Sequence, residues 1–428
     1  MGNAFPQRPS HQERMLLVGV RRPHMSVRDM QRSLDELVQL VGTAGGEVAA
    51  VTTQQMKTIS AHSFLGSGKV DELKKMVHDE KIDAVVVDDQ LTAVQNRNLE
   101  EALTVRVLDR PSLILDVFAL RARSHEGKLQ VELAQLQYIA PRLVGRGEML
   151  SQQAGGIGTR GPGETALEVD RRRIRERMTL LRRRLDTVRA ERDVQREKRL
   201  QSSMPLVSLV GYTNAGKSTL LNALSHADAL VEDKLFATLD PLTRRVKLPT
   251  GREILLADTV GFIERLPHEL IEAFRATFEE ISYAHLLLHV IDLSDENMEV
   301  KYHTVERVLH DLGLTEKPTF IVLNKSDAGH AVPRFAADGI KISALHGQGL
   351  DELLRCIDAY FSKHFVTLEL LLPHTRGDVL SELYRCGYIR EVRHEPEGII
   401  VQCSLLASAA KKFSEFIQPC EHSPSPTP

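Results

Sequence analysis

A glycine-framed run that ends in lysine and serine carries the clearest chemistry in this sequence. Its eight residues are Gly211, Tyr212, Thr213, Asn214, Ala215, Gly216, Lys217 and Ser218. A strand-like run at 206–210 precedes it and a helical run follows, which is the context that the GxxxxGK[ST] spacing requires. The glycines let backbone amides turn toward phosphate oxygens, Lys217 can bridge the β- and γ-phosphates, and the Ser218 hydroxyl can bind Mg²⁺. We therefore predict a nucleotide site here.

A second glycine–lysine run, at 66–69, fails the same criteria. It lacks a glycine at the required upstream distance, and Val70 stands where the hydroxyl is needed. We interpret this run as a loop that precedes a helix.

A carboxylate follows the next buried strand run of this region. Residues 254–257 are apolar, and after them come Asp258, Thr259, Val260 and Gly261. Asp258 can hold a Mg²⁺-bound water and the Gly261 amide can bond the γ-phosphate. The DxxG pattern is weak alone, because strands that end in Asp before a turn glycine are common.

Two later segments are expected to recognise the base, and the first follows a buried strand run. The buried run 320–323 leads into Asn324, Lys325, Ser326 and Asp327. Asp327 can accept hydrogen bonds from guanine N1–H and the 2-amino group, which adenine lacks, so the wrong base leaves a carboxylate unpaired. We expect Asn324 to tie this loop to the phosphate loop and the Lys325 stem to cover the base.

The backbone of a further segment is expected to contact guanine O6. Its residues are Ser343, Ala344 and Leu345. The motifs in this order favour GTP over ATP and predict a GTPase site between Gly211 and Leu345.

The first switch is expected between the phosphate loop and Asp258. Its residues are Phe236, Ala237, Thr238, Leu239 and Asp240. Thr238 is the favoured candidate for a second Mg²⁺-bound hydroxyl that senses the γ-phosphate. Thr243 is a competitor, and an ordinary loop threonine is the remaining alternative.

Hydrolysis relies on positioning and charge stabilisation. We assign it to Lys217, Thr238, Gly261 and Asn214. Phe262 occupies the position where signalling GTPases carry a water-orienting glutamine, so slow hydrolysis that depends on an activator is expected. Asn214 can help to hold K⁺, which would supply positive charge, or it can simply satisfy loop backbone; both alternatives stay open.

The elements that position this site belong to a chain of several α/β parts. Strand-like runs at 15–20, 47–52, 82–87 and 104–108 alternate with amphipathic stretches such as 26–41, where Ser26 is placed as an N-cap. This alternation predicts a small N-terminal α/β domain with a parallel sheet.

A helical hairpin is expected next. Leu129, Leu133 and Leu136 form one stripe, and a near-heptad seam runs through 164–199. The second helix carries 13 Lys/Arg against 8 Asp/Glu, an excess of five in a chain of net charge −3. A solvated face laced with ion pairs explains such runs in general.

A glycine-rich tip lies between the two helices, with five glycines and a proline in 155–163. That density excludes regular structure. With Arg142, Arg146 and Arg160 nearby, the tip favours a phosphate-rich partner. Its contact candidates are Gly155, Gly156, Gly158, Arg160, Gly161 and Gly163.

The predicted fold class is α/β throughout, with a P-loop domain whose sheet is mostly parallel and covered by helices on both faces. A small C-terminal α/β module is expected to run as strand 367–372, helix 377–385, strand 398–405 and helix 407–417. The predicted domains are 1–123 (N-terminal α/β), 124–203 (hairpin), 204–364 (GTPase), 365–418 (C-terminal module) and 419–428 (disordered tail).

Bulk properties fit a cytoplasmic protein. With 42% hydrophobic and 26% charged residues the composition is ordinary for a globular chain. We expect no transmembrane segment and no secretory signal. The four cysteines lack CxxC spacing and are expected to be reduced. His285 and His289 fall in a strand run about 13 Å apart, too far to share a metal.

The sequence resembles the HflX family of bacterial GTPases over nearly its whole length. The segments 125–136, 141–145 and 155–165 carry this resemblance beyond the GTPase motifs. Leu242 departs from the threonine expected there, which weakens Thr243 but not Thr238. The resemblance implies binding to the large ribosomal subunit and its rRNA, with the tip near the peptidyl-transferase region, and separation of stalled ribosomes under stress. We expect the protein to be a monomer.

Two other functions stay open at this point. One is a GTP-gated adaptor of another protein or of a membrane protease, with peripheral membrane association. The other is a partner in RNA modification, for which no reactive-cysteine motif is present.

Overall fold

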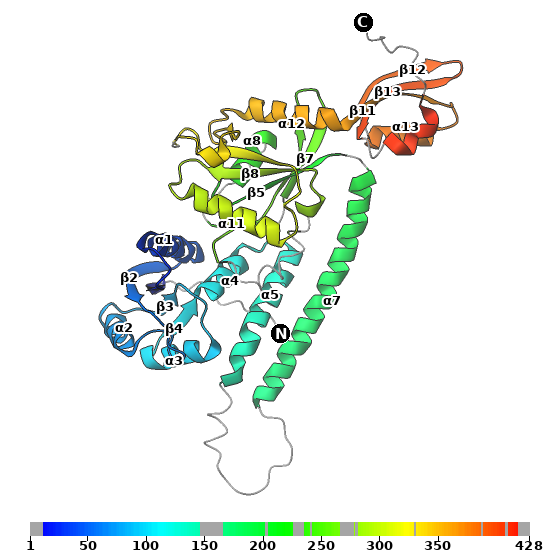
Figure 1. Ribbon diagram of the computed structural model, residues 1–428. Coiled ribbons are helices and arrows are strands. Elements are labelled where there is room, and N and C mark those ends of the chain that lie inside the picture. Colours follow the sequence, from blue (N-terminus) through cyan, green and yellow to red (C-terminus); the bar gives the residue numbers. More distant parts are fainter. Residues whose placement is uncertain are drawn as a thin grey trace. The chain divides into compact units, whose positions relative to one another are not determined.

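The computed structural model describes residues 12–145, 166–201, 204–225, 235–239, 242–265, 278, 281–328, 331–386, 388–406 and 410–417 (Figure 1). The chain divides into two compact units. The first combines Met1–Thr187 with Glu232–Asp240 and Val260–Thr277, and the second combines Val188–Val231, Pro241–Thr259 and Phe278–Pro428. The predicted domain boundaries therefore stay predictions, since the units are built from interleaved segments.

The N-terminal part of the first unit is a parallel sheet with the order β2-β1-β3-β4. Its strands are β1 (Arg14–Arg21), β2 (Glu47–Gln55), β3 (Ala84–Val87) and β4 (Arg106–Asp109). The connecting helices are α1 (Val27–Ala44), α2 (Ser67–Asp79), α3 (Ala93–Leu103) and α4 (Arg110–Arg121). The predicted strand–helix alternation is confirmed, with bounds shifted by up to three residues.

Local signals explain where these helices begin. Ser26 caps α1: its hydroxyl accepts from the backbone N–H of Asp29, and the Asp29 carboxylate accepts from the backbone N–H of Ser26. Asp109 caps α4 in the same way with Ser112. Gly66 precedes α2, and Lys69 on that helix contacts Thr52 and Glu72. The interpretation of 66–69 as a loop before a helix is right only for Gly66, because residues 67–69 form the first turn of α2.

A helical arm follows α4. It consists of α5 (His125–Ile139), a 3₁₀ turn η1 (Ala140–Gly145) and α7 (Ala166–Gln201). Leu129 and Leu133 of α5 pack on Leu181 and Leu185 of α7, so the predicted stripes do meet. Figure 1 shows the two helices side by side. Glu132 receives two hydrogen bonds from Arg177, at 2.7 and 2.9 Å.

The second unit holds a six-stranded sheet with the order β10-β9-β8-β5-β7-β6, in which only β6 is antiparallel to its neighbour. The strands are β5 (Leu206–Gly211), β6 (Leu242–Lys247), β7 (Glu253–Asp258), β8 (Leu286–Asp292), β9 (Thr319–Asn324) and β10 (Ile340–Lys341). Its described helices are α8 (Lys217–Ser225), α11 (Met298–Asp311), the 3₁₀ turn η2 (Arg334–Ala336) and α12 (Leu350–His364).

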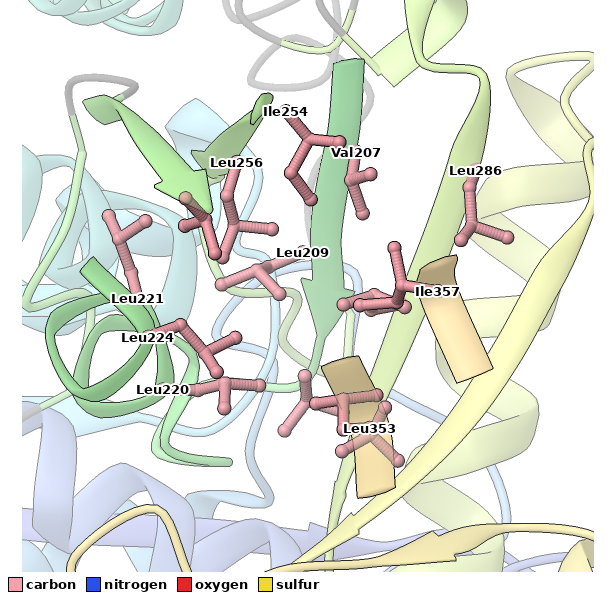
Figure 2. Packing of buried hydrophobic residues seen from close by; sticks show 14 of the residues in the cluster. Val207, Leu209, Leu220, Leu221, Leu224, Ile254, Leu256, Leu286, Leu353 and Ile357 are labelled. Carbon is pink, nitrogen blue, oxygen red and sulfur yellow. The ribbon is translucent and has the colours of Figure 1, made fainter. Parts of the chain in front are cut away.

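One apolar core holds this sheet together. Leu209 and Leu256 of the central strands meet Leu220 of α8 and Leu353 of α12, and none of these side chains is exposed to solvent (Figure 2). Burial of each such side chain contributes about 1.5–3 kcal/mol. The loops at the carboxyl ends of the strands are thereby fixed on a rigid base.

The C-terminal module corrects two expectations. It has three antiparallel strands in the order β11-β13-β12, namely β11 (Phe365–Leu372), β12 (Tyr388–Glu395) and β13 (Gly398–Leu406). The sequence reasoning missed β12, whose side chains are mostly exposed and so show little apolar alternation. Helix α13 (Gly377–Cys386) matches, but the helix expected at 407–417 is wrong: its described part is a 3₁₀ turn, η3 (Lys411–Phe416).

None of the helices in the described ranges is both long and apolar enough to cross a membrane.

Candidate nucleotide site

The phosphate loop begins where β5 ends. Gly211 and Gly216 both have positive φ, +153° and +88°. A side chain on Gly211 would collide with the Val290 carbonyl, and one on Gly216 would collide with the Asn324 amide. Only glycine therefore lets the chain wrap tightly enough for its amides to face an anion.

Lys217 stands at the start of α8 and is 6% exposed. Its ammonium group donates to the carbonyls of Gly211 at 3.1 Å and Tyr212 at 2.8 Å. Burial lowers the pKa of Lys217 to about 8, against the opposing attraction of Asp258. The cation is thus held within the loop that the phosphates would occupy.

Two oxygen donors meet beside this lysine. The Ser218 hydroxyl donates to Oδ2 of Asp258 over 2.6 Å, and Asp258 is fully buried. The Thr259 hydroxyl donates to the Leu209 carbonyl at 2.6 Å, which fixes the residue after Asp258 against β5. A hydroxyl and a carboxylate from separate elements are the hard oxygen ligands that suit Mg²⁺.

The base-binding loop is tied to the phosphate loop through one amide. Asn324 donates from Nδ2 to the Ala215 carbonyl at 2.9 Å and accepts from the Ala344 backbone at 3.0 Å. Both contacts help to link the segments 211–218, 324–327 and 343–345. The parallel strands β5, β7, β8 and β9 all end at this edge of the sheet.

Asp327 is prepared to accept hydrogen bonds. A hydrogen bond from Ser343 lowers the pKa of Asp327 below its usual value, and the charge on His346 adds to this effect. Leu345 leaves 76% of its surface exposed. The carboxylate and an open apolar side chain therefore lie on the two loops expected to hold the base.

Two neighbours of the site were missed by the sequence reasoning. Asp292, at the end of β8, accepts from the Lys325 ammonium at 2.7 Å and so orients that side chain. His346 lies 3.6 Å from Asp327. Asp292 could have been found, because it ends a buried parallel strand beside β9.

The two switch segments belong to the first unit, unlike the loops above. Phe236 has a positive φ of 54° and packs edge-on against Phe118 of α4, with ring centroids 4.6 Å apart. Thr238 is half-buried, and Asp240 lies outside the described residues. Thr243 lies in β6, paired with Ala257 of β7.

The segment after Asp258 is deeply buried. Phe262 is 1% exposed, so its ring is part of a packed interior. Glu264 accepts from Arg32 of α1 at 3.3 Å, and its carbonyl accepts from Arg110 of α4 at 3.4 Å. Arg265 donates to the Asp88 carbonyl at 3.2 Å. Residues that follow Gly261 are therefore held by the N-terminal sheet and its helices.

Arg110 is the centre of these contacts. It is 1% exposed, forms ion pairs with Glu36 and with Asp88 (2.7 Å to the latter), and reaches the Ser33 carbonyl at 3.3 Å. A buried guanidinium with partners on several sides is expensive to disturb, because removal of one partner leaves the other charge uncompensated.

Arg142 does not fit its expected role. Its guanidinium donates to Asp109 at 3.1 Å and to the Leu91 carbonyl at 2.7 Å, and stacks 3.4 Å from the centre of the Tyr138 ring. It is thus a structural residue rather than a phosphate-binding one. Arg146 and the tip residues 155–163 lie outside the described residues.

No group of histidine, cysteine and acidic side chains able to hold a metal occurs among the described residues. His289 is buried beside Glu306 and stacks on Tyr302, while burial lowers its pKa. His285 instead accepts at Nδ1 from the Leu206 backbone N–H, at 3.1 Å. These contacts agree with two separate structural histidines.

A parallel sheet whose strand ends carry GxxxxGKS, DxxG and NKxD loops defines a P-loop GTPase, a GTP-hydrolysing enzyme. Residues 206–325 match a family model described as a 50S ribosome-binding GTPase. Residues 31–119 and 121–199 match models described as the N-terminal and the middle region of a GTP-binding GTPase.

The chain belongs to the HflX family of GTPases. It is 47% identical to the GTPase HflX of Caldanaerobacter subterraneus, over 97% of this chain and 96% of that protein. It is 43% identical to the GTPase HflX of Escherichia coli, over 87% of this chain and 89% of that protein. A GTP-binding protein from Sulfolobus solfataricus, solved in complex with GDP, is 24% identical over 82% of this chain and 99% of that chain, with a TM-score of 0.45.

Proposed function

We propose that this GTPase binds the large ribosomal subunit in its GTP form and separates stalled ribosomes under stress. The helical arm is the observation that carries the proposal. Its helices are fixed by the Leu129–Leu133–Leu181–Leu185 cluster and the Arg177–Glu132 fork, and they lead to the glycine-rich tip.

The outer surface of α7 supplies the charge. Its exposed arginines within the described part are Arg172, Arg173, Arg175, Arg177, Arg182, Arg183 and Arg184. Guanidinium groups on a rigid helix suit the phosphates of folded RNA, which contribute salt-dependent affinity without sequence readout. The match of 206–325 to a 50S ribosome-binding model supports the same partner. The proposal implies a cytoplasmic location.

The chemistry follows from the loops. Ser218 and Thr238 hydroxyls, with Asp258 through a water, would hold Mg²⁺, which neutralises phosphate charge when bound. Lys217 would leave the Gly211 and Tyr212 carbonyls for the phosphate oxygens, and the Gly261 amide would bond the γ-phosphate. Asp327 would read N1–H and the 2-amino group of guanine, beside the Ser343–Leu345 backbone.

A slow intrinsic rate is part of the proposal. Phe262 is buried, 1% exposed, and its side chain has no group that could orient water. We expect the docked subunit to align the switch segments for hydrolysis, so that the rate of hydrolysis depends on binding.

Cosedimentation tests the proposal. The full chain, loaded with a non-hydrolysable GTP analogue or with GDP, is spun with purified large subunits. Association with the analogue and little with GDP is expected. No association with either nucleotide would overturn the ribosomal function and leave the adaptor alternative. As a control, small subunits alone should not pellet the protein.

A further inference from the structure

Helix α4 is in contact with both switch segments. At its start, Arg110 donates to the carbonyl of Glu264, three residues after Gly261. Near its end, Phe118 packs edge-on on Phe236, two residues before Thr238, at an interplanar angle of 84°. Arg110 and Phe118 are each 1% exposed. A shift of α4 would therefore move the surroundings of both γ-phosphate sensors.

The same helix is tied to the base of the arm. Asp109, the N-cap of α4, is 2% exposed and accepts a hydrogen bond from the Tyr138 hydroxyl in the last turn of α5. Arg142 of η1 donates to the same carboxylate at 3.1 Å and to the Tyr138 carbonyl at 2.9 Å. In the sequence, Gly155 follows Arg142 by thirteen residues.

The Asp109 carboxylate binds several partners from different elements. Its carboxylate also accepts from the Leu91 backbone at 3.0 Å and from the Ser112 backbone at 3.1 Å. A buried carboxylate with several partners keeps its geometry, since loss of a partner leaves a desolvated polar group unsatisfied. A displacement of Tyr138 at the end of α5 should therefore also displace Asp109 at the start of α4.

We propose that α4 is the element that couples the arm to both switch segments, with Tyr138 as its positioning residue. Binding of the subunit at the tip would displace Tyr138 and, through its bond to Asp109, helix α4. Arg110 and Phe118 on α4 would then displace the segments around Gly261 and Thr238. This inference rests on the proposed binding of the large subunit. It adds the contacts through which binding of the subunit would change the rate of hydrolysis.

The substitution Tyr138→Phe tests the route. It removes the hydroxyl bonded to Asp109 and keeps the ring under Arg142. GTP hydrolysis is measured with and without large subunits, and binding is measured by cosedimentation. We expect unchanged binding, an unchanged basal rate, and a loss of at least fivefold in the subunit-stimulated kcat with KM for GTP unaltered. Tyr384→Phe, at a tyrosine 62% exposed on α13, is the matched control and should behave as wild type.

The outcomes separate the two proposals. Equal stimulation of wild type and Tyr138→Phe would overturn the coupling while leaving the ribosomal function intact. Failure of wild type to bind subunits would overturn the ribosomal function alone, and the coupling is then decided by hydrogen exchange in the free protein. If a GTP analogue and GDP give the same exchange at 110–118 and 125–139, the coupling is wrong; a nucleotide-dependent difference that Tyr138→Phe abolishes supports it.

Discussion

Lys217 loses its proton more readily than an exposed lysine does, because it is buried. Burial lowers its pKa to about 8, whereas an unfolded lysine titrates near 10.5, so the folded, nucleotide-free protein binds fewer protons between these values. Stability of that form should therefore rise from pH 8 toward 10.5. Phosphates need the protonated amine, so nucleotide affinity should move in the opposite direction.

The first prediction concerns this lysine. From pH 7 to pH 9 the affinity for GDP should fall, by up to about tenfold per pH unit above the folded pKa. Fluorescence titration with a labelled GDP measures it. Lys217→Arg keeps its charge over this range and should give a flatter profile; equal slopes for both proteins would contradict the assigned pKa.

Asn214 carries the second prediction. It is exposed at the top of the phosphate loop with φ +62°, a position open to solvent and to a cation. If its amide helps to hold K⁺, hydrolysis by wild type should be faster in potassium than in sodium buffer, and Asn214→Ala should lose the difference. Identical rates in both buffers would leave the amide a purely structural role.

The third prediction separates the two switch threonines. Thr238 lies two residues after the anchored Phe236, whereas Thr243 is part of the β6–β7 ladder. Thr238→Ala should weaken binding of a GTP analogue in Mg²⁺ and slow hydrolysis, with GDP affinity little changed. Thr243→Ala should leave the ratio of GTP-analogue to GDP affinity as in wild type. Calorimetry with both nucleotides decides between them.

At the scale of elements, the arm depends on a small apolar seam. Leu181 is fully buried between α5 and α7, whereas Leu180 beside it is 42% exposed. Leu181→Ala should cost the helix pair about 2–5 kcal/mol, and Leu180→Ala much less. Hydrogen exchange across α5 is the measurement; equal protection in the two variants would show that the seam does not hold the arm.

The nucleotide loops could be predicted from sequence because each is a short run whose residues act together. Strand-end placement then follows from the parallel sheet, as for Asp258 and Asn324. The contacts of α4 could not be predicted, since Phe118 meets Phe236 and Arg110 meets Glu264 across more than a hundred residues. Arg142 shows the opposite error: a surface cation by type is committed to a buried carboxylate by the fold.

At the scale of the whole molecule, the proposed function assigns the first contact with the large subunit to the tip, residues 155–163. Deletion of 155–163 removes none of the residues that hold the two helices of the arm together. These are Leu129, Leu133, Leu181 and Leu185 and the Glu132–Arg177 pair. We expect it to abolish subunit-stimulated hydrolysis and to weaken cosedimentation at least tenfold, with intrinsic hydrolysis retained. Binding as strong as that of the intact chain would remove the role given to the tip.

The switch segments share a packed interior with the N-terminal sheet and its helices, although motif reading assigns them to the nucleotide domain. A truncated protein cut at 204–364 would lack Phe118, on which the ring of Phe236 packs. We expect such a fragment to aggregate or to rearrange its switch segments. A turnover number measured on it would therefore not apply to the full-length protein. Kinetic comparison among relatives is therefore meaningful only between full-length chains.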